Sequence, residues 1–299
     1  MATVSTQPTA HSAVAHGPRP LAIVGKALIY LILGAWAILV IFPMVWAIMT
    51  SFKTDQEIFF SPWALPAKPI FDNFVRAWTT ARIGEYFINT LIIVLPSLFL
   101  TLLLSSMAAY VLARFEFRGR NLITYLFLIG MIFPLFLALV PLYFVTQKLG
   151  LLDTYPGLIL VYVAFSLSFT IFFLINFFKT LPKELGEAAL IDGASQYDIF
   201  FRVYLPLARP GLITMGIFNF LGQWNQYILP NTLMITNDDK STHYVLSQGL
   251  YYLQAKQFYG SDWSGLFAAV TIVMIPTLVV YLIFNDRIEK GMTAGAVKG

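Results

Sequence analysis

Charged residues are scarce in this sequence. Asp, Glu, Lys and Arg make up 11% of the 299 residues, whereas hydrophobic residues make up 58% and aromatic residues 16%. Soluble globular domains carry about a quarter charged residues, so this chain has too few to cover a water-facing surface. A lipid bilayer removes that difficulty, because side chains that face lipid are apolar. The composition therefore excludes an ordinary soluble domain and predicts an integral membrane protein.

Cysteine is absent altogether, and histidine occurs only three times. Without cysteine the chain forms no disulfide, no iron–sulfur cluster and no cysteine-ligated zinc site. The histidines His11, His16 and His243 are scattered, and two of them lie in a polar N-terminal stretch. We therefore predict no metal site in this chain.

Long charge-free windows are the main feature that is present. Each of six windows exceeds the roughly 20 residues that a helix needs to cross the hydrocarbon core. We predict an all-α, polytopic membrane protein with six transmembrane helices, in the windows 27–52, 86–113, 121–147, 154–178, 210–237 and 263–285. Packed membrane helices tolerate proline, and we interpret the prolines inside these windows as ordinary kinks, with gating hinges as the alternative: Pro43, Pro96, Pro134, Pro141 and Pro276.

Sequence motifs of nucleotide binding and catalysis are missing as well. There is no GxxxxGK[ST] phosphate loop, no GxSxG element and no HExxH element. The chain therefore does not hydrolyse ATP by the phosphate-loop machinery, and the windows hold no catalytic pair for a membrane-embedded enzyme. They also lack the ionisable group that proton-coupled carriers commonly keep at membrane depth, although sodium could be held by carbonyls and hydroxyls. Energy for transport must then come from another chain.

The distribution of Lys and Arg predicts the orientation. With six spans, both termini lie on one side, which carries twelve of the 19 basic residues, and the other side carries seven. The positive-inside rule then places both termini in the cytoplasm of a multi-pass protein of the plasma or inner membrane. We expect residues 1–20 to be a disordered cytoplasmic N-terminus, and no cleaved signal peptide, because the first apolar stretch is too long. No internal repeat is found, so the second half of a pore would come from another chain.

The segment between the fourth and fifth windows, residues 182–210, predicts two short helices on the cytoplasmic face. Pro182 is suited to the start of a helix, and residues 183–191 are rich in helix formers. Asp192 and Gly193 indicate a turn, and Ser195 can cap a second helix. Prolines 206 and 210 mark the return to the membrane. Small alanines would allow another surface to approach closely, with charged contacts from Glu187, Asp192 and Arg202.

This segment resembles the EAA loop of binding-protein-dependent ABC importers, in the pattern Glu187-Ala188-Ala189, Asp192-Gly193-Ala194, Phe200, Leu205-Pro206-Leu207 and Pro210. Other stretches are similar to the smaller permease of maltose-type importers, among them Ser51-Phe52-Lys53 and Tyr155-Pro156-Gly157-Leu158. The resemblance implies a type I ABC importer permease fold with cytoplasmic EAA coupling helices. It also implies that the loop docks in a cleft on an ATPase subunit through Glu187, Ala188, Ala189, Asp192, Gly193, Ala194, Phe200, Leu205 and Pro206.

The same resemblance implies the partners and the domain plan. The chain would be a transporter subunit, not an enzyme, forming a heterodimer with a second permease. Two ATPase subunits would carry ATP and Mg, and an extracytoplasmic binding protein would deliver the solute; no cofactor on this chain and no nucleic acid is implied. Residues 21–290 would be the six-helix permease domain. Residues 291–299 would be a cytoplasmic tail that contacts the ATPases through Thr293, Ala294, Gly295 and Lys298, with a frayed terminus as the alternative.

The fifth window holds the candidate solute path. Asn219, Gln223 and Gln226 recur at helical spacing, so they share one face, and Trp224, Asn225 and Tyr227 stand beside them. Amides bond hydroxyl groups and aromatic rings stack on sugar rings, which favours a sugar. The alternative is hydrogen bonding between helices. In the maltose importer the sugar is held mainly by the larger permease, so this half could also serve only as a wall of the path.

The sequence therefore predicts a permease subunit that translocates a sugar, a di- or oligosaccharide, by alternating access driven by ATP. An ABC permease for another solute, such as a polyol phosphate or a peptide, is the alternative, and a secondary carrier would leave the EAA-like segment unexplained. The outer loops 53–85 and 238–262 would face the binding protein. The aromatic residues of the second loop could instead anchor the chain at the membrane interface.

Overall fold

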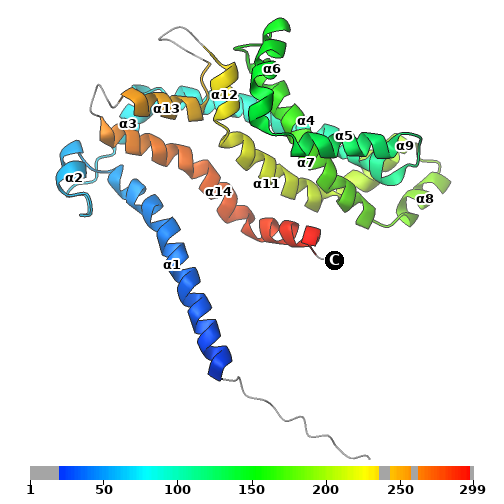
Figure 1. Cartoon of the computed structure of the whole chain (residues 1–299), viewed down its shortest axis with the longest axis horizontal. Helices are drawn as coiled ribbons and strands as arrows, with labels where there is room; N and C mark the ends of the chain where they lie inside the picture. The colour runs from blue at the N-terminus through cyan, green and yellow to red at the C-terminus, as the bar shows by residue number, and fades with distance from the viewer. Residues whose placement is uncertain (1–19, 236–242, 257–261, 297–299) are drawn as a thin grey trace, which may run out of the picture. The chain divides into compact units, whose positions relative to one another are not determined.

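The computed structural model describes residues 20–235, 243–256 and 262–296, and every regular element in these ranges is a helix (Figure 1). The chain forms two compact units, Met1–Ile48 and Met49–Gly299. The first holds most of α1 (Pro20–Thr50), a 31-residue helix whose stretch Val24–Thr50 has a mean hydropathy of 2.5. Of the residues 1–20 that are predicted to be disordered, 1–19 lie outside the described residues and Pro20 is the first residue of α1.

Three further helices are long and apolar enough to cross a membrane. They are α4 (Ile83–Arg114), α7 (Tyr155–Thr180) and α14 (Trp263–Ala296). Together with α1 they confirm the first, second, fourth and sixth predicted spans. Helix α14 continues beyond its predicted end, so the first part of the predicted tail, up to residue 296, is helical; Lys298 lies outside the described residues.

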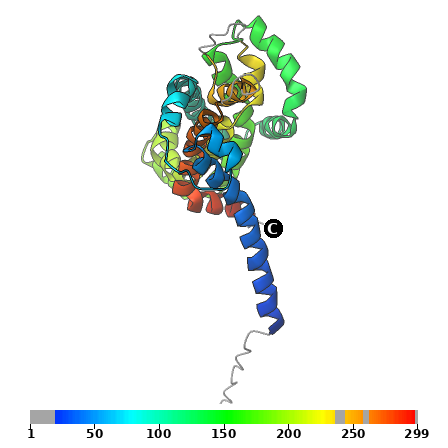
Figure 2. The ribbon, with the colours of Figure 1, turned by 90° about the vertical axis from the view of Figure 1, so that its left-hand side faces the viewer.

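The prediction of a continuous third span is wrong. Residues 121–147 form two helices, α5 (Arg120–Ile132) and α6 (Leu135–Lys148), bent by 103° at a break that Figure 2 shows in the green part of the ribbon. Pro134 has no backbone N–H, and the residue before a proline avoids the helical region. Phe133 accordingly has an extended backbone, with ψ of 123°.

The fifth window is not one helix either. Helix α11 (Arg209–Trp224) has 16 residues, and after a break α12 (Ile228–Leu233) follows. Polar side chains at the break compete for backbone groups: Asn225 Nδ2 donates to Leu221 O, and Gln226 Oε1 accepts from the Ile228 amide. Among the described residues the structure thus has four continuous spans, or five if the bent pair counts as one span, in place of the predicted six.

Helix α4 contributes residues to three buried apolar clusters of the second unit, which follow one another along its length. Ile83 and Tyr86 near its start pack with Trp224 and α13 (Leu246–Lys256). Ile93 and Val94 pack with α7 and α12. Ala109, Tyr110 and Leu112 near its end pack with the last turns of α7 and with the chain that follows α8 (Glu184–Ile191).

The short helices of the second unit lie at its opposite ends (Figure 1). Helices α2 (Asp55–Phe60), α3 (Asp72–Thr79) and α13 gather at the end where α4 begins. Helices α8 and α9 (Gln196–Asp198) lie at the end where α4 finishes. The segment predicted to touch an ATPase and the segments predicted to face a binding protein are therefore separated by the length of the spans.

A fully buried lysine holds the loop after α1 in shape. Lys53 is 0% exposed, and its Nζ donates to the carbonyls of Ser61 and Pro62, 3.0 Å away in each case, at the end of α2. Asn73 Nδ2 donates to the carbonyls of Ser51 and Lys53. A positive charge stabilises the carbonyl end of a helix, and these bonds compensate for the loss of water around the ammonium group.

Two acidic side chains cap the start of α14 and tie it to α2 and α3. Asp262 Oδ1 accepts from the Gly265 amide and from Arg76 on α3, and Asp55 Oδ1 accepts from the Ser264 amide. Burial alone would raise the pKa of Asp262, but the hydrogen bonds from Arg76 and Gly265 hold it below its ordinary value. The carboxylate is therefore ionised at neutral pH, which suits a helix N-terminus.

Candidate functional site

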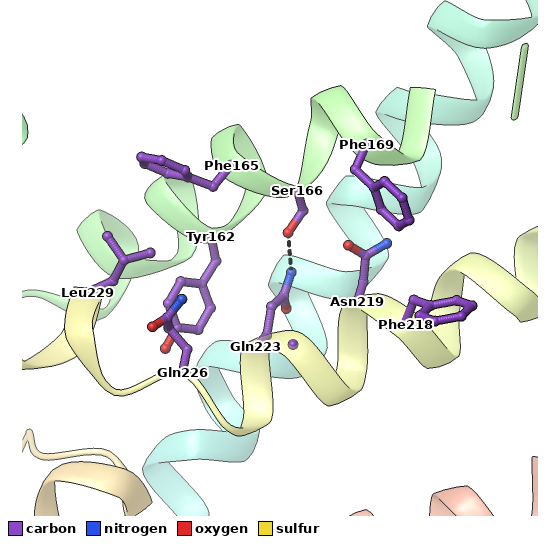
Figure 3. Close-up of a pocket in the computed structure, with 10 residues that line it drawn as sticks. Tyr162, Phe165, Ser166, Phe169, Phe218, Asn219, Gln223, Gln226 and Leu229 are labelled. Carbon is purple, nitrogen blue, oxygen red and sulfur yellow. Dashed lines mark hydrogen bonds between the residues drawn. The ribbon is translucent and has the colours of Figure 1, made fainter. Parts of the chain in front are cut away.

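A cavity of about 250 Å³ lies between α7 and α11. Figure 3 shows residues of the two helices facing one another across it. None of its lining residues carries a charge; they are Tyr162, Phe165, Ser166, Phe169, Phe218, Asn219, Gly222, Gln223, Gln226 and Leu229. Aromatic rings and amides without a formal charge suit a neutral, hydroxyl-rich solute, because they combine stacking surface with hydrogen-bonding groups.

The three amides of the predicted solute path are brought together here. Asn219 and Gln223 are 7% and 5% exposed, and both line the cavity with Gln226. Asn219 Nδ2 is already engaged, since it donates to Thr170 Oγ1 (2.9 Å) and to the carbonyl of Met215 (2.8 Å). Gln226 lies beyond the end of α11, yet its side chain still reaches the same cavity.

Gln223 differs from its neighbours because half of its amide has no partner. Its Nε2 donates to Ser166 Oγ on α7, 3.0 Å away, as the dashed line in Figure 3 marks. Its Oε1 is buried and accepts no hydrogen bond from any residue that the structure describes. A buried acceptor without a donor is costly, so a hydroxyl or N–H group of a solute that reached this oxygen would gain a favourable hydrogen bond.

The other three residues of the predicted path do not line the cavity. The Trp224 indole stacks on Phe220 and donates to the carbonyl of Val273. Asn225 is exposed and bonds its own helix, and the Tyr227 ring packs against Tyr251 at 5.4 Å. Trp224 follows Gln223 directly on α11 and therefore points to a different face, whereas Asn225 and Tyr227 lie beyond the end of that helix.

The wall that α7 contributes to the cavity was not singled out from the sequence. Tyr162, Phe165, Ser166 and Phe169 all line it. Their spacing, i, i+3, i+4 and i+7, places them on one helical face. That spacing was available in the fourth window, but an aromatic stripe at helical spacing is equally typical of a face that packs against lipid or another helix.

The loop predicted to couple to an ATPase has the predicted first helix, the predicted turn and the predicted serine cap. Helix α8 begins at Glu184, and Gly193 ends it in the left-handed region with φ of 83°. Ser195 Oγ then accepts from the Asp198 amide and caps α9, and its hydroxyl holds the pKa of Asp198 below the ordinary range. A π-helical segment, η1 (Ile199–Tyr204), and α10 (Leu205–Leu207) lead into α11.

The predicted coupling residues divide into an outward set and an anchoring set. Ala189, Ala194, Phe200 and Leu205 belong to or pack on the buried cluster at the end of α4. The outward set is exposed, and comprises Glu187, Ala188, Asp192, Gly193 and Pro206. Ile191 and Tyr197 beside them are 86% and 74% exposed. Apolar side chains that project from a polar loop are typical of a docking surface.

Of the predicted tail, Thr293, Ala294 and Gly295 lie in the last turns of α14, and only their backbone is described. Within the described residues no group of three or more acidic or histidine side chains could hold a metal ion. The structure therefore brings together two features of interest, the uncharged cavity in the spans and the exposed loop at one end.

The long apolar helices define the class: a polytopic membrane protein, with an uncharged cavity between two of its helices and an exposed helical loop at one end. Residues 101–294 match the family described as the inner membrane component of binding-protein-dependent transport systems. The chain belongs to that family. Its members work in general with a partner permease, an ATPase and a binding protein.

Named relatives cover nearly the whole chain. It is 49% identical over 286 residues to the diacetylchitobiose uptake system permease protein NgcG of Streptomyces coelicolor, spanning 96% of this chain and 92% of the relative. It is 34% identical over 277 residues to the trehalose/maltose transport system permease protein MalG of Thermococcus litoralis, spanning 91% and 97%. A bacterial ABC transporter that imports the acidic polysaccharide alginate matches with a TM-score of 0.77 at 20% identity, over 90% of this chain and 98% of that one. The last match shows the fold.

Proposed function

We propose that this chain forms one half of a permease that imports a neutral di- or oligosaccharide, and that the cavity between α7 and α11 lines its path. The observation that carries the proposal is Gln223 Oε1, a buried acceptor without a partner in a cavity that has no charged lining residue. The names of two relatives support a neutral sugar as the solute, since diacetylchitobiose, trehalose and maltose are neutral sugars. A polyol phosphate fits less well, because phosphate recognition favours cationic side chains and none lines this cavity.

The energy for import comes from two partner ATPase subunits that carry ATP and Mg. Glu187, Ala188 and Asp192 meet the ATPase on the exposed face of α8, and Ala189, Ala194 and Phe200 fix that helix to the spans. Closure of the ATPase dimer on ATP pushes α8 and opens the cavity outward, and hydrolysis resets it inward. The tail, through Thr293, Ala294, Gly295 and Lys298, adds a second ATPase contact.

A binding protein delivers the solute at the opposite end of the chain. Phe60, Trp63 and Leu65 in the loop 53–85 are 85%, 70% and 80% exposed. Tyr251 on α13 is exposed, whereas Tyr244 packs inward against Tyr86. Tyr252 on the same helix is half-buried, and Phe258 and Tyr259 lie outside the described residues. The exposed aromatics supply the contact area that protein partners favour.

The orientation is testable directly, because the chain contains no cysteine that would react in the background. We expect Ser195→Cys, at the start of α9, to react with a membrane-impermeant maleimide only after the membrane is opened. Ala64→Cys, in the loop after α1, should react in intact cells or spheroplasts. Both positions are exposed. The reverse labelling pattern would place α8 outside the cell and remove its role as an ATPase contact.

A further inference from the structure

Arg114, the last residue of α4, joins the ends of three segments. Its Nη2 donates to the carbonyls of Phe178 and Leu181, at 2.8 and 2.7 Å, and so holds the C-terminal end of α7. Its guanidinium carbon lies 4.5 Å from the centre of the Tyr204 ring, at the end of η1. A cation over an aromatic ring and charge-assisted bonds to helix carbonyls are both favourable, so one side chain binds α4, α7 and η1 to each other.

Tyr204 extends this connection to α8. Its hydroxyl donates to the carbonyl of Pro182, 3.2 Å away, in the link between α7 and α8. Gly186 of α8 packs directly on the ring, since a Cβ at that position would lie 2.7 Å from the Tyr204 hydroxyl oxygen. Tyr204 is 3% exposed, and next to its contact with Gly186 it borders a cavity of about 310 Å³ that Glu187 and Leu190 of α8 also line.

Tyr110, one turn before Arg114, closes the cluster from the side of α4. Its ring lies 5.3 Å from that of Tyr204, 5.2 Å from that of Phe200 and 5.9 Å from that of Phe178. A packed aromatic cluster transmits displacement because protein interiors are close-packed. A shift of α8 against Tyr204 is therefore passed to the ends of α4 and α7.

We propose that Arg114 and Tyr204 form the mechanical joint that converts movement of α8 into movement of α4 and α7. Both act as positioning residues, since neither lines the solute cavity nor belongs to the outward set of the coupling loop. Without the joint, α8 pivots on the short link that follows α7 and leaves the spans where they are. This inference rests on the proposed role of α8 as the ATPase contact.

The test compares Arg114→Gln, Arg114→Lys and Tyr204→Phe in reconstituted complexes, with sugar imported per ATP hydrolysed as the measurement. We expect Arg114→Gln to lower this ratio about tenfold, within the 5- to 150-fold range of typical coupling. Tyr204→Phe keeps the ring and should lower it less, and Arg114→Lys should recover part of the loss because it keeps the charge. The double variant Arg114→Gln/Tyr204→Phe should be no worse than Arg114→Gln alone, as expected for two parts of one joint.

The control is Arg118→Gln, which removes an exposed arginine from the loop that follows Arg114. ATPase association, measured by a crosslink from Ala188→Cys, should be unchanged in every variant. If Arg114→Gln does not assemble, the milder Arg114→Lys and Tyr204→Phe decide the matter. If the variants that assemble import as much sugar per ATP as the parent complex, the proposed joint is wrong. A parent complex that does not couple ATP to import at all overturns the proposed function instead.

Discussion

Gly193→Pro should abolish solute-stimulated ATP hydrolysis in complexes that contain this chain. Gly193 has φ of 83°, whereas proline is restricted to a φ near −65°. Its amide also donates to the carbonyl of Leu190, 3.0 Å away, and proline has no N–H to replace that bond. We expect a local cost of about 3 kcal/mol or more, which the loop relieves by turning α8 away from α9. The measurement is ATPase activity with and without binding protein and sugar.

Gly119 supplies a matched control for this substitution. It has φ of 93° at the start of α5, in the other loop at the same end, and apart from the adjoining residues no described atom lies within 4 Å of a Cβ built at either glycine. Replacement of either glycine by alanine should cost about 1–2 kcal/mol in local strain. Only Gly193→Ala should lower solute stimulation, because only Gly193 sets the direction of α8.

Glu187→Lys tests the same loop without changing its backbone. Glu187 is exposed in the first turn of α8, so reversal of its charge leaves the buried cluster intact. We expect the ATPase to bind more weakly and solute stimulation to fall. If Gly193→Pro and Glu187→Lys both retained stoichiometric ATPase association and full coupling, the assignment of this loop would be wrong.

Gln223→Leu should weaken the apparent affinity of the permease for its solute by about 5- to 150-fold, since a lost hydrogen bond in a dry site is worth about 1–3 kcal/mol. The change keeps approximate volume but removes the free Oε1, together with the bond to Ser166. We expect Gln226→Leu to act in the same direction. Asn219→Leu should also reduce assembly, because that amide holds Thr170.

Asn225→Leu is the control, because it removes an exposed amide at the same helix end that bonds only to its own helix in the described contacts. It should leave transport kinetics unchanged. A binding protein can set the entry affinity and hide the effect in whole cells, so the variants are best compared in reconstituted complexes that transport without it. Unchanged kinetics for all three cavity variants would place the solute contacts on the partner permease and leave this chain as a wall.

Charge-free windows predicted four spans well because a helix that crosses lipid needs length and apolarity and little else. They did not predict a continuous helix correctly in the third and fifth windows, where local backbone and side-chain effects break the helix. Pro134 breaks the third window, and the polar pair Asn225 and Gln226 ends the fifth. The proline and the polar pair were both visible in the sequence, but membrane helices often continue through a proline, as α4 and α14 do at Pro96 and Pro276.

The sequence predicts the conformation of the loop and the grouping of the amides, but not the contact between Arg114 and Tyr204. The loop around Gly193 follows from local rules, such as a glycine in a turn and a serine that caps a helix, so its conformation was readable. Helical spacing grouped Asn219, Gln223 and Gln226, and the structure keeps them together. The contact of Arg114 with Tyr204 joins residues far apart in the chain, and no local pattern in a single sequence reports which of several arginines closes such a contact.

The central claim is that this chain moves a neutral sugar only when ATP is hydrolysed on the side where α8 lies. The most direct measurement is uptake of labelled neutral disaccharides into proteoliposomes that contain this chain, its partner permease and two ATPase subunits, with the binding protein supplied on the side opposite α8. The account predicts uptake when ATP is supplied on the α8 side, none with a non-hydrolysable analogue, and no inhibition by phosphorylated sugars. Uptake at the same rate without ATP, driven by a proton or sodium gradient, would contradict it.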